Sequence, residues 1–489
     1  MNALLVAALA LTSAGSSLQV DMKEIGTIRP RSVKEIGSSN WRLGCETLDR
    51  DYISFDSYRE YVAPLGIKMV RLQGGWAKCE RVKGKYDFAW LDRVVDYLAE
   101  RGVECAIETD YGNPIYPGGG TQDLAAGYPT SETALAAWDA WVGALARHFK
   151  GRVKTFLMWN EPDIRPMDGS APKTPAQIAA FNVRTAKAIL KEIPEADLAG
   201  LSLAMNDPGF FEECLKAFGE DVKLFKYFIY HGYTRAPEAA YETVEAMKAA
   251  LAKHAPAAKL WQGENGCPSE MAAKFALSHI AWSEVSQAKW DMRRMLGDLG
   301  HDVISSVFTI CDFAHRGREI NTKGLLRADA DGEVVAVKRA YYAVRNVAAV
   351  FDDKWTRVKD SAFAHGFGTS DASLSTYHYT DAAGTPLFVF WTHGGDWTLA
   401  EGTELDFVHG GGRWRYDYVR PGDGFTTRPA FFRYDGAPLK DPVWVDLFTG
   451  KVYELPKRCQ VKGKSYVSFC DIPVYDSPCL LTERSALPL

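Results

Sequence analysis

The part of the sequence that most constrains the fold lies between residues 41 and 351, where short apolar runs alternate with amphipathic stretches eight times. Short apolar runs bounded by turn residues are typical of buried strands. Eight strand-helix units in about 310 residues are the number and length of a (β/α)₈ barrel, an α/β fold. A doubly wound open sheet is the alternative, because alternation alone does not reveal whether the sheet closes. The predicted strands are Trp41–Leu48, Lys68–Gln73, Glu104–Glu108, Thr155–Trp159, Asp197–Leu203, Tyr227–Tyr230, Lys259–Gln262 and Val303–Ile310.

Helical spacing of apolar residues and helix-start signals mark the segments between these strands. Thr174, Pro175 and Gln177 supply an N-cap, a first-turn proline and a capping-box acceptor, so a helix is expected to begin there. Leu135, Trp138, Val142, Leu145 and Phe149 recur at the spacing of one helix face. The other predicted helices are Ser57–Leu65, Ala89–Arg101, Pro208–Phe218, Pro237–His254, Met271–Leu299 and Lys338–Phe351.

After Phe351 the helical periodicity ends and β-rich runs separated by turn residues follow. The chain has 489 residues, more than one hydrophobic core usually serves, so a second domain is expected. We predict a catalytic barrel over residues 39–351 and an all-β sandwich over residues 352–489. Residues 18–38 precede the barrel and are expected to add a strand to that sandwich.

The first 17 residues indicate a signal peptide. An apolar core, Leu4–Leu11, is followed by small residues, and no charged side chain occurs before Asp21. We therefore expect a secreted or periplasmic protein.

Composition excludes several classes of partner and cofactor. A formal net charge of −5 provides no basic surplus for phosphates or anionic lipids, so neither nucleic acid nor a membrane is an expected partner. The nine cysteines match no zinc-ligand spacing and the ten histidines are scattered, so we expect no metal and no cofactor. The odd number leaves at least one thiol free, although export would allow pairs such as Cys470 with Cys479.

Two glutamates stand where a barrel places its catalytic groups, at the carboxyl ends of its strands. Glu161 follows the fourth predicted strand and Glu264 follows the seventh. Cleavage of a glycosidic bond with retention requires such a pair, an acid that protonates the leaving oxygen and a carboxylate that attacks the anomeric carbon. We therefore predict Glu161 as the acid/base and Glu264 as the nucleophile, with Glu270 as the alternative nucleophile.

These motifs resemble the clan A retaining glycoside hydrolases, whose signature is Asn-Glu-Pro after strand four and a nucleophilic glutamate after strand seven. Asn160-Glu161-Pro162 and Glu264 match that signature. Lys85–Asp92 looks like the pattern of families 39 and 42, and Val445–Val452 is similar to the β-sandwich of family 39. The resemblance implies a retaining β-glycosidase acting on oligosaccharides or glycosides, exo-acting and β-xylosidase-like.

The resemblance also implies roles for residues around the two glutamates. Asn160 would bond the sugar 2-hydroxyl, Tyr233 would donate to the nucleophile, and Arg71 would hold Glu264 ionised. His231 is either a sugar contact or a buried wall residue. The remaining candidate substrate-binding residues are Glu46, Trp76, Asp110, Trp261 and Asp312. The three acids among them end predicted strands and are also candidate ion-pair partners of Arg42, Arg316 or Arg318. The clan often closes strand eight with a tryptophan, for which Phe313 or Trp282 would substitute here.

Three other functions fit the same barrel. An endo-β-glucanase of the clan shares the two glutamates and differs in the shape of its cleft. A carbohydrate-binding barrel without turnover is disfavoured by the intact pair. A metal-dependent hydrolase or an aldolase needs clustered histidines or a lysine at a strand end, and the sequence pattern places neither there.

Overall fold

The computed structural model describes residues 20–489 except 124–126, 166–170, 316–318, 360, 362, 368–372, 394–407, 410–411 and 414–420. The predicted signal peptide, Arg316 and Arg318 lie outside the described residues. No described helix combines the length and the apolar character needed to cross a membrane. The cysteines are all free thiols, so Cys470 and Cys479 are not paired.

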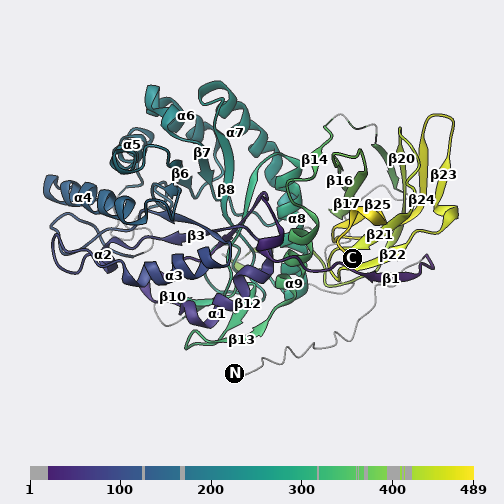
Figure 1. Ribbon diagram of the computed structural model, residues 1–489, viewed down its shortest axis with the longest axis horizontal. Coiled ribbons are helices and arrows are strands. Elements are labelled where there is room, and N and C mark those ends of the chain that lie inside the picture. The colour runs from purple at the N-terminus through teal and green to yellow at the C-terminus, as the bar shows by residue number, and fades with distance from the viewer. Residues whose placement is uncertain are drawn as a thin grey trace.

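Eight parallel strands close into a barrel, as predicted (Figure 1). The first strand of the barrel, β2, pairs with β3 on one side and with β9 on the other, which excludes the open-sheet alternative. The barrel strands are β2 (Trp41–Gly44), β3 (Met69–Gln73), β4 (Glu104–Glu108), β5 (Thr155–Leu157), β6 (Asp197–Leu203), β7 (Tyr227–Tyr230), β8 (Lys259–Asn265) and β9 (Ile304–Val307).

The helices that surround the barrel begin largely where the sequence signals them. Thr174 caps α5 in a capping box with Gln177, as expected, and Ser131 caps α4. The helices are α1 (Phe55–Val62), α2 (Trp76–Cys79), α3 (Ala89–Glu100), α4 (Glu132–Phe149), α5 (Pro175–Glu192), α6 (Pro208–Phe218), α7 (Tyr241–His254), α8 (Glu284–Gly300) and α9 (Arg339–Val350).

Two features of the barrel differ from the prediction. The helix expected over Met271–Leu299 begins only after Ser283, whose hydroxyl accepts a hydrogen bond from the Ser286 amide. Residues 271–282 are irregular, and three of them have positive φ, which a helix does not tolerate. Two unpredicted hairpins follow β9, one of β10 (Phe313–His315) and β11 (Glu319–Asn321) and one of β12 (Leu326–Ala328) and β13 (Val334–Val337).

The C-terminal region forms two antiparallel sheets, the predicted all-β architecture. The larger sheet has the order β1 (Glu24–Thr27), β22 (Lys451–Glu454), β21 (Pro442–Asp446), β25 (Cys479–Glu483), β17 (Pro386–His393), β16 (Ser373–Thr380) and β14 (Thr356–Arg357). The smaller sheet has the order β15 (Phe363–Phe367), β20 (Arg428–Tyr434), β24 (Val467–Val474) and β23 (Gln460–Lys462). A separate pair, β18 (Val408–His409) and β19 (Gly412–Arg413), completes the strands.

Strand β17 explains how this domain is attached to the barrel. Phe388 and Phe390 face the core of the sandwich, whereas Leu387, Val389 and Trp391 belong to the core that continues into the barrel. A strand buried on both faces reads as a continuous apolar run, as this one does. Helices α8 and α9 lie between the barrel and the sandwich (Figure 1). The sandwich therefore supports the barrel on the side of these two helices.

Candidate active site

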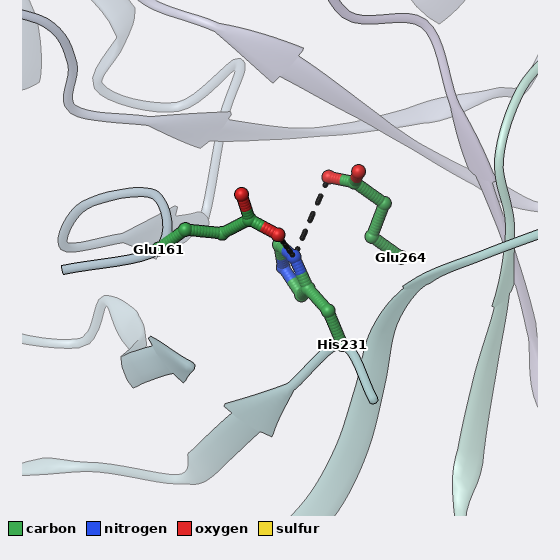
Figure 2. A group of neighbouring side chains, drawn as sticks. All are labelled: Glu161, His231 and Glu264. Atoms are coloured by element: carbon green, nitrogen blue, oxygen red, sulfur yellow. Dashed lines mark hydrogen bonds and ion pairs between the residues drawn. The ribbon is translucent and has the colours of Figure 1, made fainter. Parts of the chain in front are cut away.

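Glu161 and Glu264 face each other across the mouth of the barrel with His231 between them (Figure 2). Glu161 follows β5, Glu264 is the second-last residue of β8, and His231 follows β7. Nδ1 of His231 lies 2.9 Å from Oε1 of Glu161 and 3.6 Å from Oε2 of Glu264. One oxygen of each carboxylate and the histidine nitrogen all lie within 4.8 Å of one another. Glu161 has a φ of 49°, an uncommon conformation for a residue other than glycine that recurs at functional sites.

The surroundings push the pKa values of the two glutamates in opposite directions. Burial raises the pKa of Glu161, and the hydrogen bond from His231 offsets this only in part. Burial also opposes ionisation of Glu264, but the charges of His231 and Arg71 outweigh it and lower the pKa of that carboxyl. A proton shared by the pair therefore favours Glu161 over Glu264.

Arg71 links Glu264 to three other polar side chains. Its Nη1 donates to Oε2 of Glu264 at 2.8 Å and lies 3.3 Å from Oε1 of Glu46. Its Nη2 donates to Glu108 at 2.9 Å and to Oδ1 of Asn160 at 2.6 Å. A guanidinium shared in this way holds the side chains of several strands in one arrangement.

Two tyrosines complete the hydrogen bonds around the glutamates. Tyr233 donates to Oε1 of Glu264 at 2.8 Å, and Asn160 donates from Nδ2 to the hydroxyl of Tyr111 at 2.8 Å. Both oxygens of Glu264 thus accept hydrogen bonds, which favours the ionised form.

A cavity of about 540 Å³ opens above these groups, a size suited to a small ligand. Of the predicted site residues, Glu46, Asn160, Glu161, Tyr233 and Glu264 line it, and so does the proposed substitute Phe313. Arg71 and His231 are buried behind the lining and contact the two glutamates. Glu46 shares Arg71 with Glu264, and burial raises its pKa to about 7.

Besides Arg71 and His231, four other predicted substrate-binding residues do not line the cavity. Trp76 is buried between Tyr116 and Trp141 with its Nε1 bonded to Glu80, and Trp261 lies in the barrel interior with its Nε1 bonded to Ser306. Asp312 is held 2.6 Å from Lys338 in a buried ion pair.

Asp110 is the fourth of these residues. It is buried and lies outside the cavity lining, and burial together with the charge of Glu108 raises its pKa well above the ordinary value. The proposed tryptophan substitute Trp282 is also buried, with Nε1 bonded to the carbonyl of Leu277. All five side chains are thus buried outside the cavity lining, and four of them have a hydrogen-bond or ion-pair partner in the protein.

The alternative nucleophile Glu270 lies outside the cavity lining, 3.8 Å from Arg327, and its side chain is 54% exposed. Several cavity and network residues were not predicted. Glu108 and Gln73 end their strands, so the same strand-end rule that selected Glu46 points to them. Arg50, Met205, Phe275, Phe308 and Lys323 also line the cavity, and none of them was predicted as a site residue.

Among the described residues, the donor atoms of Glu161, His231 and Glu264 also converge enough to hold a metal ion. The guanidinium of Arg71 already contacts Glu264 at 2.8 Å, and Nδ1 of His231 is bonded to Glu161. A cation placed there would compete with both partners, so the donor set suits acid-base chemistry better than metal binding.

Comparison with known proteins gives two local similarities in sequence and several similarities in fold over nearly the whole chain. The beta-galactosidase family model, glycoside hydrolase family 42, matches residues 52–117, a stretch that includes Lys85–Asp92. Beta-galactosidase BgaA of Clostridium cellulovorans is 39% identical over 51 residues, which are 10% of this chain and 8% of that protein. The chain thus spans far less than two thirds of this curated relative.

The similar solved structures cover nearly the whole chain. A family 39 glycoside hydrolase from Bacteroides cellulosilyticus WH2 has a TM-score of 0.59 at 17% identity, over 91% of this chain and 81% of that one. A monomeric beta-xylosidase from Caulobacter crescentus CB15 has a TM-score of 0.54 at 15% identity, over 94% and 97%. A family 30 endoxylanase from Clostridium papyrosolvens C71 has a TM-score of 0.54 at 11% identity, over 94% and 98%. The chain has the fold of these glycoside hydrolases.

Proposed function

We propose that the protein is a retaining β-glycosidase of clan A that works by double displacement, with Glu264 as nucleophile and Glu161 as acid/base. The observation that carries the proposal is the pair of glutamates itself. One oxygen of each carboxylate lies within 4.8 Å of one oxygen of the other, and the two pKa values are shifted in opposite directions. Retaining glycosidases place their two carboxyl groups about 5 to 5.5 Å apart, whereas inverting enzymes need about 6.5 Å or more.

In the first step Glu161 donates its proton to the glycosidic oxygen while Glu264 attacks the anomeric carbon. The leaving group departs with that proton, and a glycosyl ester on Glu264 remains. In the second step Glu161, now ionised, removes a proton from water, which attacks the anomeric carbon and frees Glu264. His231 contacts Glu161 and stabilises its charge between the two steps.

The family resemblance and the cavity volume of about 540 Å³ favour exo action on oligosaccharides or aryl glycosides. β-Xylosides are the first substrates to test. Export of the protein remains a prediction from the sequence of residues 1–17. An endo-acting enzyme is the competing proposal, since an endoxylanase is among the proteins of similar fold.

The test follows the anomeric configuration of the product by NMR, with 4-nitrophenyl β-xyloside, β-glucoside and β-galactoside and with a xylo-oligosaccharide. We expect the β-anomer to appear first and to mutarotate later. Initial release of the α-anomer would overturn double displacement. Shortening of the oligosaccharide from one end indicates exo action, whereas internal cleavage supports the competing proposal.

The Glu161→Gln variant tests the assignment against a barrel that only binds sugar. We expect this variant to lose at least about 100-fold in turnover of the xylo-oligosaccharide, because the leaving group no longer receives a proton. Glu270→Gln, at the exposed glutamate, is the matched control and should keep wild-type turnover. Unchanged hydrolysis by the Glu161→Gln variant would remove Glu161 from the mechanism.

A further inference from the structure

Lys323 is a buried lysine in the wall of the active-site cavity. It lies between β11 and β12, lines the same cavity as Glu161 and Glu264, and is only 2% exposed. Lysine is almost never buried to this extent unless its charge is paired. The surroundings of this ammonium group therefore need an explanation.

The contacts of Lys323 do not compensate its charge. Within the described part of the chain, its Nζ forms no ion pair with a carboxylate. Its hydrogen bond to Oδ1 of Asn321 is 3.5 Å long, and the ring of Tyr233 lies 5.6 Å away. Burial lowers the pKa of Lys323 to about 8, and the charge of Glu264 offsets this effect only in part.

Two other buried lysines provide the contrast. Lys289 lies 2.6 Å from Asp476, and Lys338 lies 2.6 Å from Asp312. Both are fully buried, and each has a carboxylate as direct partner. Lys323 differs from them in facing a cavity instead of an acidic side chain.

The acidic side chains of the cavity are already engaged. Glu161 is bonded to His231, and Glu264 and Glu46 share Arg71. Arg50, a second cation in the lining, also has a donor to spare, because its Nη1 is buried without a hydrogen-bond partner. Arg50 pairs with Asp49, which is outside the lining, so the cavity presents two cations that form no ion pair with a carboxylate of its lining.

We propose that the glycone of the substrate carries an anionic group, a carboxylate or a sulfate ester, and that Lys323 pairs with it. The inference rests on the proposed glycosidase function. Lys323 packs toward Tyr233, which donates to the nucleophile, so it borders the part of the cavity that holds the sugar under attack. An uncharged xylose would leave its buried ammonium group without a directly bonded anion, with only the more distant charge of Glu264 acting on it.

The expected preference follows from the strength of a hydrogen bond between two charged groups. Such a bond in a water-poor site changes affinity by about tenfold to 100-fold relative to an uncharged partner. Because the glycone stays in place through the first transition state, the preference should appear in kcat/KM.

The test compares two matched pairs of substrates. The first pair is 4-nitrophenyl β-D-glucuronide and its methyl ester, and the second is 4-nitrophenyl 6-O-sulfo-β-D-glucoside and the unmodified β-D-glucoside. We expect the wild-type protein to prefer the charged member of at least one pair by tenfold or more in kcat/KM. The pair that shows the preference identifies the anion as carboxylate or sulfate.

The Lys323→Met variant keeps an unbranched side chain one heavy atom shorter than lysine and removes its charge. It should reduce the preference by about tenfold to 100-fold, while Lys323→Arg should retain most of it. Lys274→Met is the matched control, since this lysine is 67% exposed and bonded to Glu319 on the outside of the same region. It removes the same charge and should leave the preference unchanged.

The outcomes separate this inference from the proposed function. The anionic glycone would be overturned if the wild-type protein preferred the neutral member of both pairs, or if a folded Lys323→Met variant kept the wild-type preference. Hydrolysis of neutral glycosides would in that case still support the proposed glycosidase function. If the protein hydrolysed neither these substrates nor the β-glycosides and xylo-oligosaccharide of the first test, both the anionic glycone and the glycosidase function would be wrong. Thermal unfolding checks that the variant is folded, and if it is not, the wild-type preference decides alone.

Discussion

Arg71 and Glu264 form a buried ion pair, with Nη1 of the arginine 2.8 Å from Oε2 of the glutamate. The arginine side chain is 1% exposed and the glutamate side chain 13%. Arg71 lies in β3 and Glu264 in β8, on well-separated strands of the barrel, so the pair fixes the nucleophile relative to the opposite wall. Together with the charge of His231, this pair lowers the pKa of Glu264, which burial alone would raise.

The hydrogen bond from Tyr233 to Glu264 gives the first prediction. Tyr233→Phe removes a donor to the charged carboxylate, so the pKa of Glu264 should rise. We expect kcat/KM to fall about tenfold to 100-fold, and its acidic limb to move to higher pH because the nucleophile must be ionised. The pH profile of kcat/KM measures both effects.

Tyr227→Phe is the control for this variant. Tyr227 is half-buried in the same strand, β7, at the end of the barrel opposite the cavity. An unshifted acidic limb in the Tyr233→Phe variant would mean that this hydrogen bond does not set the pKa of Glu264.

The acid role of Glu161 predicts a dependence on the leaving group. A 2,4-dinitrophenolate leaves without protonation, whereas a phenolate of higher pKa needs the proton that Glu161 supplies. Glu161→Ala should therefore slow the release of phenol from a phenyl glycoside at least about 100-fold more than the release of dinitrophenol. Steady-state rates on the two aryl glycosides measure the difference.

Glu264→Ala should instead abolish hydrolysis of both aryl glycosides, because the nucleophile is needed whatever the leaving group is. Equal losses on the two substrates in the Glu161→Ala variant would contradict its role as the acid.

The sequence predicted the barrel and the positions of the two glutamates for a simple physical reason. Buried parallel strands read as apolar runs, and the carboxyl ends of those runs meet at one mouth, so Glu161 and Glu264 converge once the strands are counted. The same reasoning placed Glu46 in the cavity. These features follow from local pattern and chain order alone.

The direction of a side chain after a strand does not follow from local pattern. Asp312 follows β9 much as Glu46 follows β2, yet its partner is Lys338, which stands at the start of α9. Lys323 enters the cavity from a turn between two short strands that only tertiary pairing defines. The start of α8 was misplaced because residues 271–282 contain apolar residues that pack as a loop.

Glu46 predicts a pH-dependent difference in stability. Burial raises its pKa from 4.5 to about 7 in the folded protein, so the folded state binds more protons than the unfolded state between these pH values. The free energy of unfolding contributed by Glu46 therefore falls as pH rises from about 4.5 to 7. Glu46→Gln does not titrate, so its Tm relative to the wild type should increase between pH 5 and pH 8.

Glu270→Gln makes the same substitution at a glutamate whose side chain is 54% exposed, and its Tm difference from the wild type should not change with pH. A Tm difference for Glu46→Gln that is equal at pH 5 and pH 8 would show that Glu46 ionises as easily in the folded protein as in the unfolded chain.

The Asp312 and Lys338 pair predicts a loss of stability that a second substitution repairs. Asp312→Asn removes the carboxylate charge and leaves the buried Lys338 ammonium with neutral hydrogen-bond partners such as Ser269 and the Thr322 carbonyl, which should cost about 3 to 5 kcal/mol of unfolding free energy. Combining Asp312→Asn with Lys338→Met removes both charges and should recover most of that loss. Urea unfolding of the single and double variants measures the coupling. If Asp312 instead bound the sugar, Asp312→Asn would keep its stability and raise KM, and Lys338→Met would not compensate it.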